Sequence, residues 1–271
     1  MPGAPDQEYA RARTVLLDAL EALETHLNAV ILVGAQAIYL HTGEAEFAVA
    51  AYTTDADLAV VPADLADTPK LADALAAAGF NADAENLGIW ISRSVHASVD
   101  LLVPESLGGP GRRGARLGPH GNRVARKARG LEAAVVENAV MPIKAFDAAD
   151  HRRFDVRVAG PGALLVAKLH KLWERREQPR RQDDKDAFDA YRLLSYMETT
   201  DAAARLRALA SDARSSEVTR EALAFLETLF ATADAQGSAM AGRYVEGLDD
   251  PAFVSAACGA LAQDLLSNVR N

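Results

Sequence analysis

Apolar residues recur along this chain with two different periods. Over residues 6–27 they fall at helical spacing, with Val15, Leu16, Leu20 and Leu23 on one stripe, which predicts an amphipathic helix. Short apolar runs of strand length come next. They predict strands over residues 29–33, 52–61, 89–92, 98–103, 133–136 and 154–158, with helices over 36–40 and 69–78.

The pattern changes at Pro161, after which only helical spacing remains. Proline suits the first position of a helix, and amphipathic stretches cover residues 162–176, 184–197, 201–212, 218–233 and 251–267. The sequence therefore predicts an α+β fold. A mixed β-sheet lobe over residues 1–160 is expected to pack on a helical bundle over residues 161–271, with a cleft between them.

Composition limits the kinds of protein that this chain can be. It has 38 acidic and 29 basic residues and a net charge of −9, which argues against a general nucleic-acid binder. The single cysteine, Cys258, excludes an intrachain disulfide framework. We expect no signal peptide and no apolar run long enough to span a bilayer. The expected location is therefore cytoplasmic, with no membrane partner.

The most informative polar residues are Asp55 and Asp57, at the head of an apolar run. In a strand their side chains project from the same face. Two adjacent carboxylates repel unless a cation lies between them, and a hard divalent ion such as Mg²⁺ binds both carboxylates and phosphate oxygens. A second Asp-x-Asp at Asp184 and Asp186 shows that the spacing alone is a weak signal. A solvated strand end or a helix cap is the alternative.

Two neighbouring segments support a metal site. Gly34 follows the predicted strand 29–33 and opens a helix through Ala35 and Gln36, so backbone N–H groups there would face an anion. Asp100 lies near the head of the strand predicted over 98–103 and would add a third carboxylate. An ordinary charge on an edge strand is the alternative for Asp100.

These residues resemble the polymerase-β-like nucleotidyltransferase superfamily, whose signature is a glycine turn opening a helix, an Asp-x-Asp strand and a later strand with a third aspartate. Residues 163–172 and 185–194 are similar to the last two motifs of the AbiEii/MenT group, toxins of type IV toxin–antitoxin systems. The resemblance spans residues 28–195, with all four motifs in order. Many superfamily members have Gly-Gly or Gly-Ser where this chain has Gly34-Ala35, so Gln36 or backbone N–H groups must contact the phosphates.

The resemblance implies a nucleotidyltransferase-like fold and a metal-dependent enzyme. It would transfer NMP from an NTP to an acceptor hydroxyl and release pyrophosphate. The implied ligands of Mg²⁺ or Mn²⁺ are Asp55, Asp57 and Asp100, and Asp100 would also activate the hydroxyl. The implied nucleotide-binding residues are Gly34, Ala35, Gln36 and Lys168.

The helical motifs supply a lysine and an acid. By resemblance, Lys168 contacts the triphosphate and Asp186 orients that lysine or the nucleotide. Lys171, which is three residues further on the same helical face, is the other candidate lysine. Alternatively, Lys168 could extend its ammonium into water, and Asp186 and Asp189 could be first-turn acids of a helix.

Residues 112–129 contain six arginines, one lysine and no acid. Such a cluster beside a phosphate-handling site can hold a polynucleotide backbone, and a solvated loop is the alternative. The candidate nucleic-acid-binding residues are Arg112, Arg113, Arg116, Arg123, Arg126 and Lys127.

Acceptor and partner follow from the resemblance. It implies transfer to the 3′ end of tRNA, which blocks translation, and a separately encoded AbiEi/MenA-like antitoxin. Three alternatives stay open: a small-molecule acceptor, as in aminoglycoside nucleotidyltransferases; transfer of the γ-phosphate; and a catalytically silent binding protein.

Overall fold

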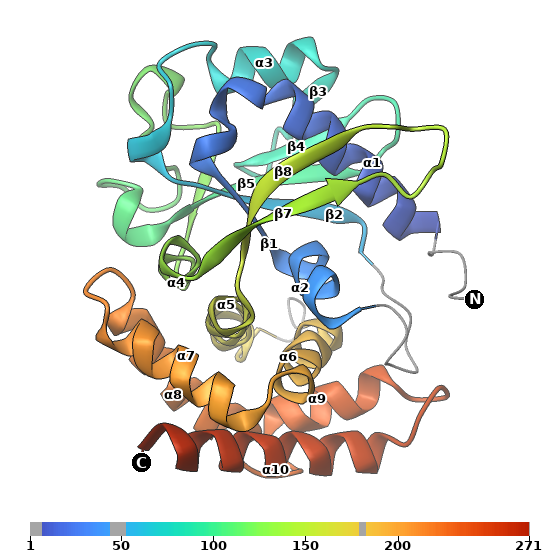
Figure 1. Ribbon diagram of the computed structural model, residues 1–271, viewed down its shortest axis with the longest axis vertical. Helices are drawn as coiled ribbons and strands as arrows, with labels where there is room; N and C mark the ends of the chain where they lie inside the picture. The colour runs from blue at the N-terminus through green and yellow to red at the C-terminus, as the bar shows by residue number, and fades with distance from the viewer. Residues whose placement is uncertain (1–6, 44–52, 179–182, 271) are drawn as a thin grey trace.

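The computed structural model describes residues 7–43, 53–178 and 183–270 (Figure 1). The strands are β1 (Val30–Val33), β2 (Asp55–Val60), β3 (Phe80–Ala82), β4 (Ile89–Ser92), β5 (Ser98–Pro104), β6 (Arg126–Ala128), β7 (Asn138–Lys144) and β8 (Arg153–Ala159). The α-helices are α1 (Gln7–Ala22), α2 (Gly34–Thr42), α3 (Leu71–Ala77), α4 (Glu132–Val136), α5 (Pro161–Arg175), α6 (Asp184–Tyr196), α7 (Thr199–Ser211), α8 (Ser216–Phe230), α9 (Gln236–Tyr244) and α10 (Pro251–Arg270).

The strands form one mixed sheet in the order β3-β4-β5-β2-β1-β8-β7, and β6 pairs with β5 outside this path. β1 runs antiparallel to β2 and parallel to β8, whereas β2 and β5 are parallel. β6 pairs with residues 102–104 of β5, just beyond the stretch that pairs with β4. The α+β fold with a mixed sheet and a helical C-terminal region, expected from the sequence, is confirmed.

Helices cover both faces of the sheet. α1 packs against β2, β5 and β8, while α2 and α4 pack against β1; in Figure 1, α1 and α3 lie above the strands and α2, α4 and the later helices lie below. All four residues of β1 are therefore buried, which explains its continuous apolar run. In β2, by contrast, Ala56 and Leu58 are buried while Asp55 and Asp57 are only half-buried.

Every described element from Pro161 onward is a helix. α5 begins with that proline, directly after β8 and Gly160. It packs against α2 and α4 from the sheet side and against α6 and α8 from the helical side, and α6 also contacts α2. The α5–α6 hairpin is thus held beside the helix that opens at Gly34.

The strand expected over residues 133–136 is wrong, because this stretch is helix α4. A short apolar run has no decisive period of its own. Here Gly130 turns the chain at φ +91°, and the buried Glu132 carboxylate accepts a hydrogen bond from the Gly130 N–H at 2.9 Å. The strand begins later, at Asn138. β3, β6 and α9 were also not expected from the pattern.

α10 contradicts the expectation that no apolar run is long enough to span a bilayer. It has 20 residues, and its most apolar window has a mean hydropathy of 1.2, enough by length and composition. The helix packs against α7, α8 and α9, with Val254, Cys258 and Leu265 buried. Length and composition alone are weak evidence for a membrane span, since core helices meet the same test.

Candidate active site

The three aspartates expected from the sequence come together near the start of two adjacent strands. Asp57 of β2 lies directly opposite Asp100 of β5, and Asp55 lies opposite Ser98. Thr53, which the sequence analysis did not single out, donates its hydroxyl to Asp55 Oδ1 at 2.7 Å. Parallel pairing of two short apolar strands therefore gathers three carboxylates that are up to 45 residues apart in sequence.

Asp57 lies against the N-terminus of α2. Gly34 opens this helix at φ +68°, and a Cβ built on it would lie 1.9 Å from Asp57 Oδ2. Only glycine leaves room for the carboxylate here and adopts this backbone conformation without strain. The N-cap residue, Val33, makes no side-chain capping hydrogen bond among the described residues, so the terminal N–H groups are suited to an anionic ligand.

Burial and crowding change the acidity of these carboxyl groups. Removal from water, followed by repulsion from Asp55 and Asp100, raises the pKa of Asp57 to about 7, although Lys171 and Lys168 act in the opposite direction. The pKa of Asp100 is also raised, chiefly by burial and despite a neighbouring arginine. The site thus concentrates more negative charge than it neutralises, as expected where a cation is to bind.

Arg126 is the arginine that neighbours Asp100. Its Nε and Nη2 donate to Asp100 Oδ2 at 3.2 and 2.5 Å. The other oxygen, Asp100 Oδ1, is buried and has no hydrogen-bond partner in the described part of the chain. The sequence predicts Arg126 among the nucleic-acid-binding residues, whereas its side chain lies inside the carboxylate cluster. The pairing of β6 with β5 brings it there.

The negative charge of the three aspartates suits a divalent cation. Their side chains do not form a complete coordination site in this arrangement. Within residues 7–43, 53–178 and 183–270, no group of three or more His, Cys, Asp or Glu side chains is arranged to hold a metal ion. The raised pKa of Asp57 and the free Oδ1 of Asp100 are both features that a bound cation would relieve. Asp55, Asp57 and Asp100 are the residues that would hold it.

Gln36 does not have the role expected for it. Its side chain is buried, with Oε1 accepting from Arg13 Nε at 2.9 Å and Nε2 donating to the Ala12 and Asp55 carbonyl oxygens at 3.0 and 3.1 Å. Both amide hydrogens are therefore used within the protein. Gln36 ties α1 to the start of β2, and only its backbone N–H can serve a phosphate.

Lys168 and Asp186 are in contact, as the resemblance implied. Lys168 Nζ lies 2.7 Å from Asp186 Oδ1 and 2.7 Å from Asp189 Oδ2, and all three side chains are buried. Burial lowers the pKa of Lys168, but the two aspartates outweigh this and raise it well above its ordinary value. The alternative that the Lys168 ammonium lies in water is thus wrong. Asp189, buried in the second turn of α6, is more than a first-turn acid.

Three further cations surround these two aspartates. Lys171 Nζ is 2.9 Å from Asp186 Oδ1, Arg175 Nη1 is 3.2 Å from Asp186 Oδ2, and Lys185 Nζ is 3.2 Å from Asp189 Oδ2. Burial raises the pKa of Asp186, but Lys168 and Lys171 outweigh this effect and hold the pKa well below its ordinary range. Lys185 and Asp189, four residues apart on a helix, could have been paired from sequence.

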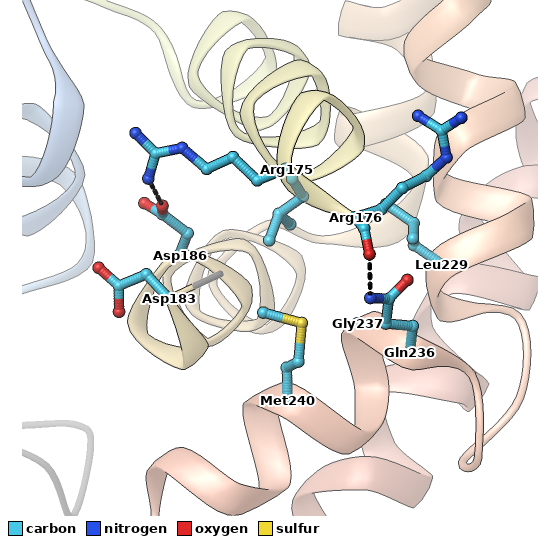
Figure 2. A pocket seen from close by; sticks show the side chains of 9 residues that line it. Arg175, Arg176, Asp183, Asp186, Leu229, Gln236, Gly237 and Met240 are labelled. Carbon is cyan, nitrogen blue, oxygen red and sulfur yellow. Dashed lines mark hydrogen bonds and ion pairs between the residues drawn. The ribbon is translucent and has the colours of Figure 1, made fainter. Parts of the chain in front are cut away.

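A small cavity lies behind this network, between α5, α6, α8 and α9. Figure 2 shows Arg175 reaching Asp186 while the Arg176 side chain points away, and the Arg176 carbonyl accepts from Gln236 Nε2 at 2.9 Å. The cavity has a volume of about 10 Å³, which suits one water molecule at most. A nucleotide therefore cannot bind there.

The basic segment, residues 112–129, is anchored by apolar residues and directs its arginines outward. Ala115, Leu117, Val124 and Ala125 are buried. Arg112, Arg113, Arg116 and Arg123 are exposed. A surface hollow of about 290 Å³ is lined by Arg112, Arg116 and Arg123, with Gly111 and Asn122 among its other residues. Lys127 donates to the carbonyl oxygens of the nearby Gly109 and Gly111 at 2.5 Å each.

Comparison with known proteins gives one match. A family model described as "Nucleotidyltransferase" matches residues 11–215, which include the Gly34 turn, the three aspartates and the α5–α6 hairpin. A search of curated proteins and a search of solved structures found no match.

Proposed function

The chain belongs to this nucleotidyltransferase family, and we propose that it is a metal-dependent enzyme that transfers NMP from an NTP to the 3′ hydroxyl of tRNA. One observation carries the proposal. Asp55, Asp57 and Asp100 converge beside a helix N-terminus that only a glycine could open. This arrangement places carboxylates for a cation next to N–H groups for a phosphate.

The reaction forms a bond between the acceptor oxygen and the α-phosphorus and breaks the bond from that phosphorus to pyrophosphate. Mg²⁺ or Mn²⁺ bound by the aspartates would supply charge neutralisation at the α-phosphate and a lower pKa for the attacking hydroxyl. Asp100 Oδ1, the oxygen without a partner, accepts the hydroxyl proton, while Arg126 keeps Oδ2 in place. The N–H groups at the start of α2 bind phosphate oxygens.

The acceptor is assigned from the basic segment. Its strand β6 pairs with β5, which carries Asp100, so the exposed arginines are linked to the catalytic strands by a few residues of chain. A hollow lined by three arginines suits consecutive phosphates of a polynucleotide better than a small neutral acceptor. The substrate cleft would lie between residues 1–160 and 161–271.

The biological setting follows from the AbiEii/MenT resemblance. We assign the chain as a cytoplasmic toxin that blocks translation by modifying tRNA, with a separately encoded AbiEi/MenA-like antitoxin as its partner. The order of the four motifs supports this assignment.

Incubation with total tRNA, Mg²⁺ and each α-labelled NTP in turn should label tRNA with at least one nucleotide. Excess EDTA should abolish labelling, because the carboxylates alone repel the substrate's phosphates. Periodate-oxidised tRNA, which lacks the 3′-terminal diol, is the matched control and should stay unlabelled. Labelling of an aminoglycoside but never of RNA would contradict the tRNA assignment, and labelling in EDTA would contradict the metal requirement.

Substitution of Gly34 tests how closely Asp57 depends on its surroundings. Gly34→Ala places a methyl group where Asp57 Oδ2 lies, so the carboxylate must move, and a displacement of this size can lower transfer about 100-fold. The readout is the rate of label transfer together with a thermal melt.

Gly43→Ala is a matched control for this substitution. Gly43 has a similar φ of +72°, but no atom of the described residues lies within 4 Å of a Cβ built on it. Both variants should lose stability from backbone strain, by about 1–2 kcal/mol. Only Gly34→Ala should lose activity, and equal activity losses in the two variants would contradict the role of the close approach.

A further inference from the structure

Lys168 and Lys171 share one face of α5 but differ in what surrounds them. Both contact Asp186 Oδ1, at 2.7 and 2.9 Å. The Lys168 side chain is 7% exposed, and its ammonium also contacts Asp189 at 2.7 Å. The Lys171 side chain is 41% exposed and has this single ion pair among the described residues. Lys168 therefore bridges α5 and α6, whereas Lys171 retains donors for another anion.

The cluster around Asp186 and Asp189 carries more positive charge than these two aspartates neutralise. Within the described part of the chain, Asp186 and Asp189 provide two negative charges, and the cations in contact with them are Lys168, Lys171, Arg175 and Lys185. Four positive charges against two leave an excess of two. A largely buried cluster with such an excess is suited to an anionic ligand at its exposed edge.

The hairpin that carries Lys171 packs beside the strand-end aspartates, because α5 and α6 both contact α2, whose first residue, Gly34, lies against Asp57. The charge of Lys171 lowers the pKa of both Asp57 and Asp100, and at Asp57 its effect is larger than that of Lys168. This electrostatic effect agrees with the packing of the hairpin beside the aspartates. On the opposite side of Asp186, Arg175 and the water-sized cavity close the network (Figure 2).

We infer that Lys171, and not Lys168, contacts the β- and γ-phosphates of the NTP, and that Lys168 is a positioning residue which fixes Asp186. The inference rests on the proposed function, because it takes an NTP bound at the aspartates as its starting point. An ammonium group binds phosphate as a compact point charge with three donors. Asp186 holds Lys171 at 2.9 Å and so directs it across the cleft.

The test compares the binding of a non-hydrolysable NTP analogue and the matching NMP, with Mg²⁺, by isothermal titration calorimetry. Lys171→Ala should weaken binding of the NTP analogue by about 10-fold or more, as expected for loss of a charge-assisted hydrogen bond. Its affinity for the NMP should not change, since an NMP has no β- or γ-phosphate. Lys185→Ala removes the same charge from the Asp189 side of the cluster and should leave the NTP affinity within about threefold of the parent.

The possible results distinguish a failure of the inference on Lys171 from a failure of the proposed function. Unchanged NTP affinity in Lys171→Ala, or equal losses in Lys171→Ala and Lys185→Ala, would overturn the inference while leaving the proposed function intact. A parallel loss of NTP and NMP affinity would also overturn it, because only a general disturbance of the site affects both. A parent protein that binds no NTP analogue would overturn the proposed function itself.

Discussion

Asp57→Asn should lower NMP transfer by about three orders of magnitude or more, since it removes a ligand of a cation worth several kcal/mol to the transition state. The substitution keeps the shape of the side chain and removes only its charge. Label transfer from an α-labelled NTP measures the loss. Asp73→Asn, at an exposed position of α3, is the matched control and should transfer label at the parent rate.

The same substitution should stabilise the metal-free protein at high pH. The pKa of Asp57 is raised from 3.8 to about 7 in the folded protein. The folded state therefore binds the Asp57 proton more tightly than the unfolded chain does. The stability that this binding contributes is fully present below pH 4 and is lost as the pH rises through 7. Asparagine removes this penalty, so the melting temperature of Asp57→Asn should exceed the parent's by about 10 °C at pH 8.

At pH 5 Asp57 is protonated in the folded parent but ionised in the unfolded chain, so the excess in melting temperature should be smaller than at pH 8 and should vanish only below about pH 4. An activity loss accompanied by equal destabilisation at both pH values would mean that Asp57 supports the fold rather than a cation.

Lys168→Met should destabilise the protein by about 3 kcal/mol, because it leaves Asp186 and Asp189 buried without the cation that they share. Methionine keeps the volume of the lysine stem and removes its charge. Urea denaturation followed by circular dichroism measures the change. The remaining cations of the hairpin limit the loss, so it should lie at the lower end of the range for broken buried ion pairs.

Lys171→Met is the control for that experiment. The Lys171 side chain is 41% exposed, so the substitution should alter stability by less than about 1 kcal/mol. Equal destabilisation by the two variants would contradict the assignment of the structural role to Lys168 alone. A Lys168→Met protein as stable as the parent would contradict it too.

Local patterns account for the parts of the site that were predictable from sequence. The alternation of side chains along β2 places Asp55 and Asp57 on one face without any knowledge of the fold. The turn at Gly34 is likewise a property of one strand and the helix that follows it. The contact between Lys168 and Asp186 needed only a helical hairpin of the expected length, and the family resemblance supplied the pairing.

Other parts depend on contacts between distant segments. Arg126 reaches Asp100 only because β6 pairs with β5 in one register, and nothing in the basic segment distinguishes it from its neighbouring arginines. The inward turn of Gln36 depends on Arg13 of α1. The burial of the Lys168 side chain depends on how α5 packs against α6. Helix α4 was mistaken for a strand because five residues are too few to reveal a period.

The central claim is that the strand-end aspartates bind a divalent cation, and titration with Mn²⁺ tests it most directly. Electron paramagnetic resonance of the free ion gives the number of Mn²⁺ ions bound per chain without requiring any activity. The account predicts at least one bound Mn²⁺ in the parent and a large loss of affinity in Asp57→Asn. Equal Mn²⁺ binding by the two proteins, or no binding by the parent, would contradict it.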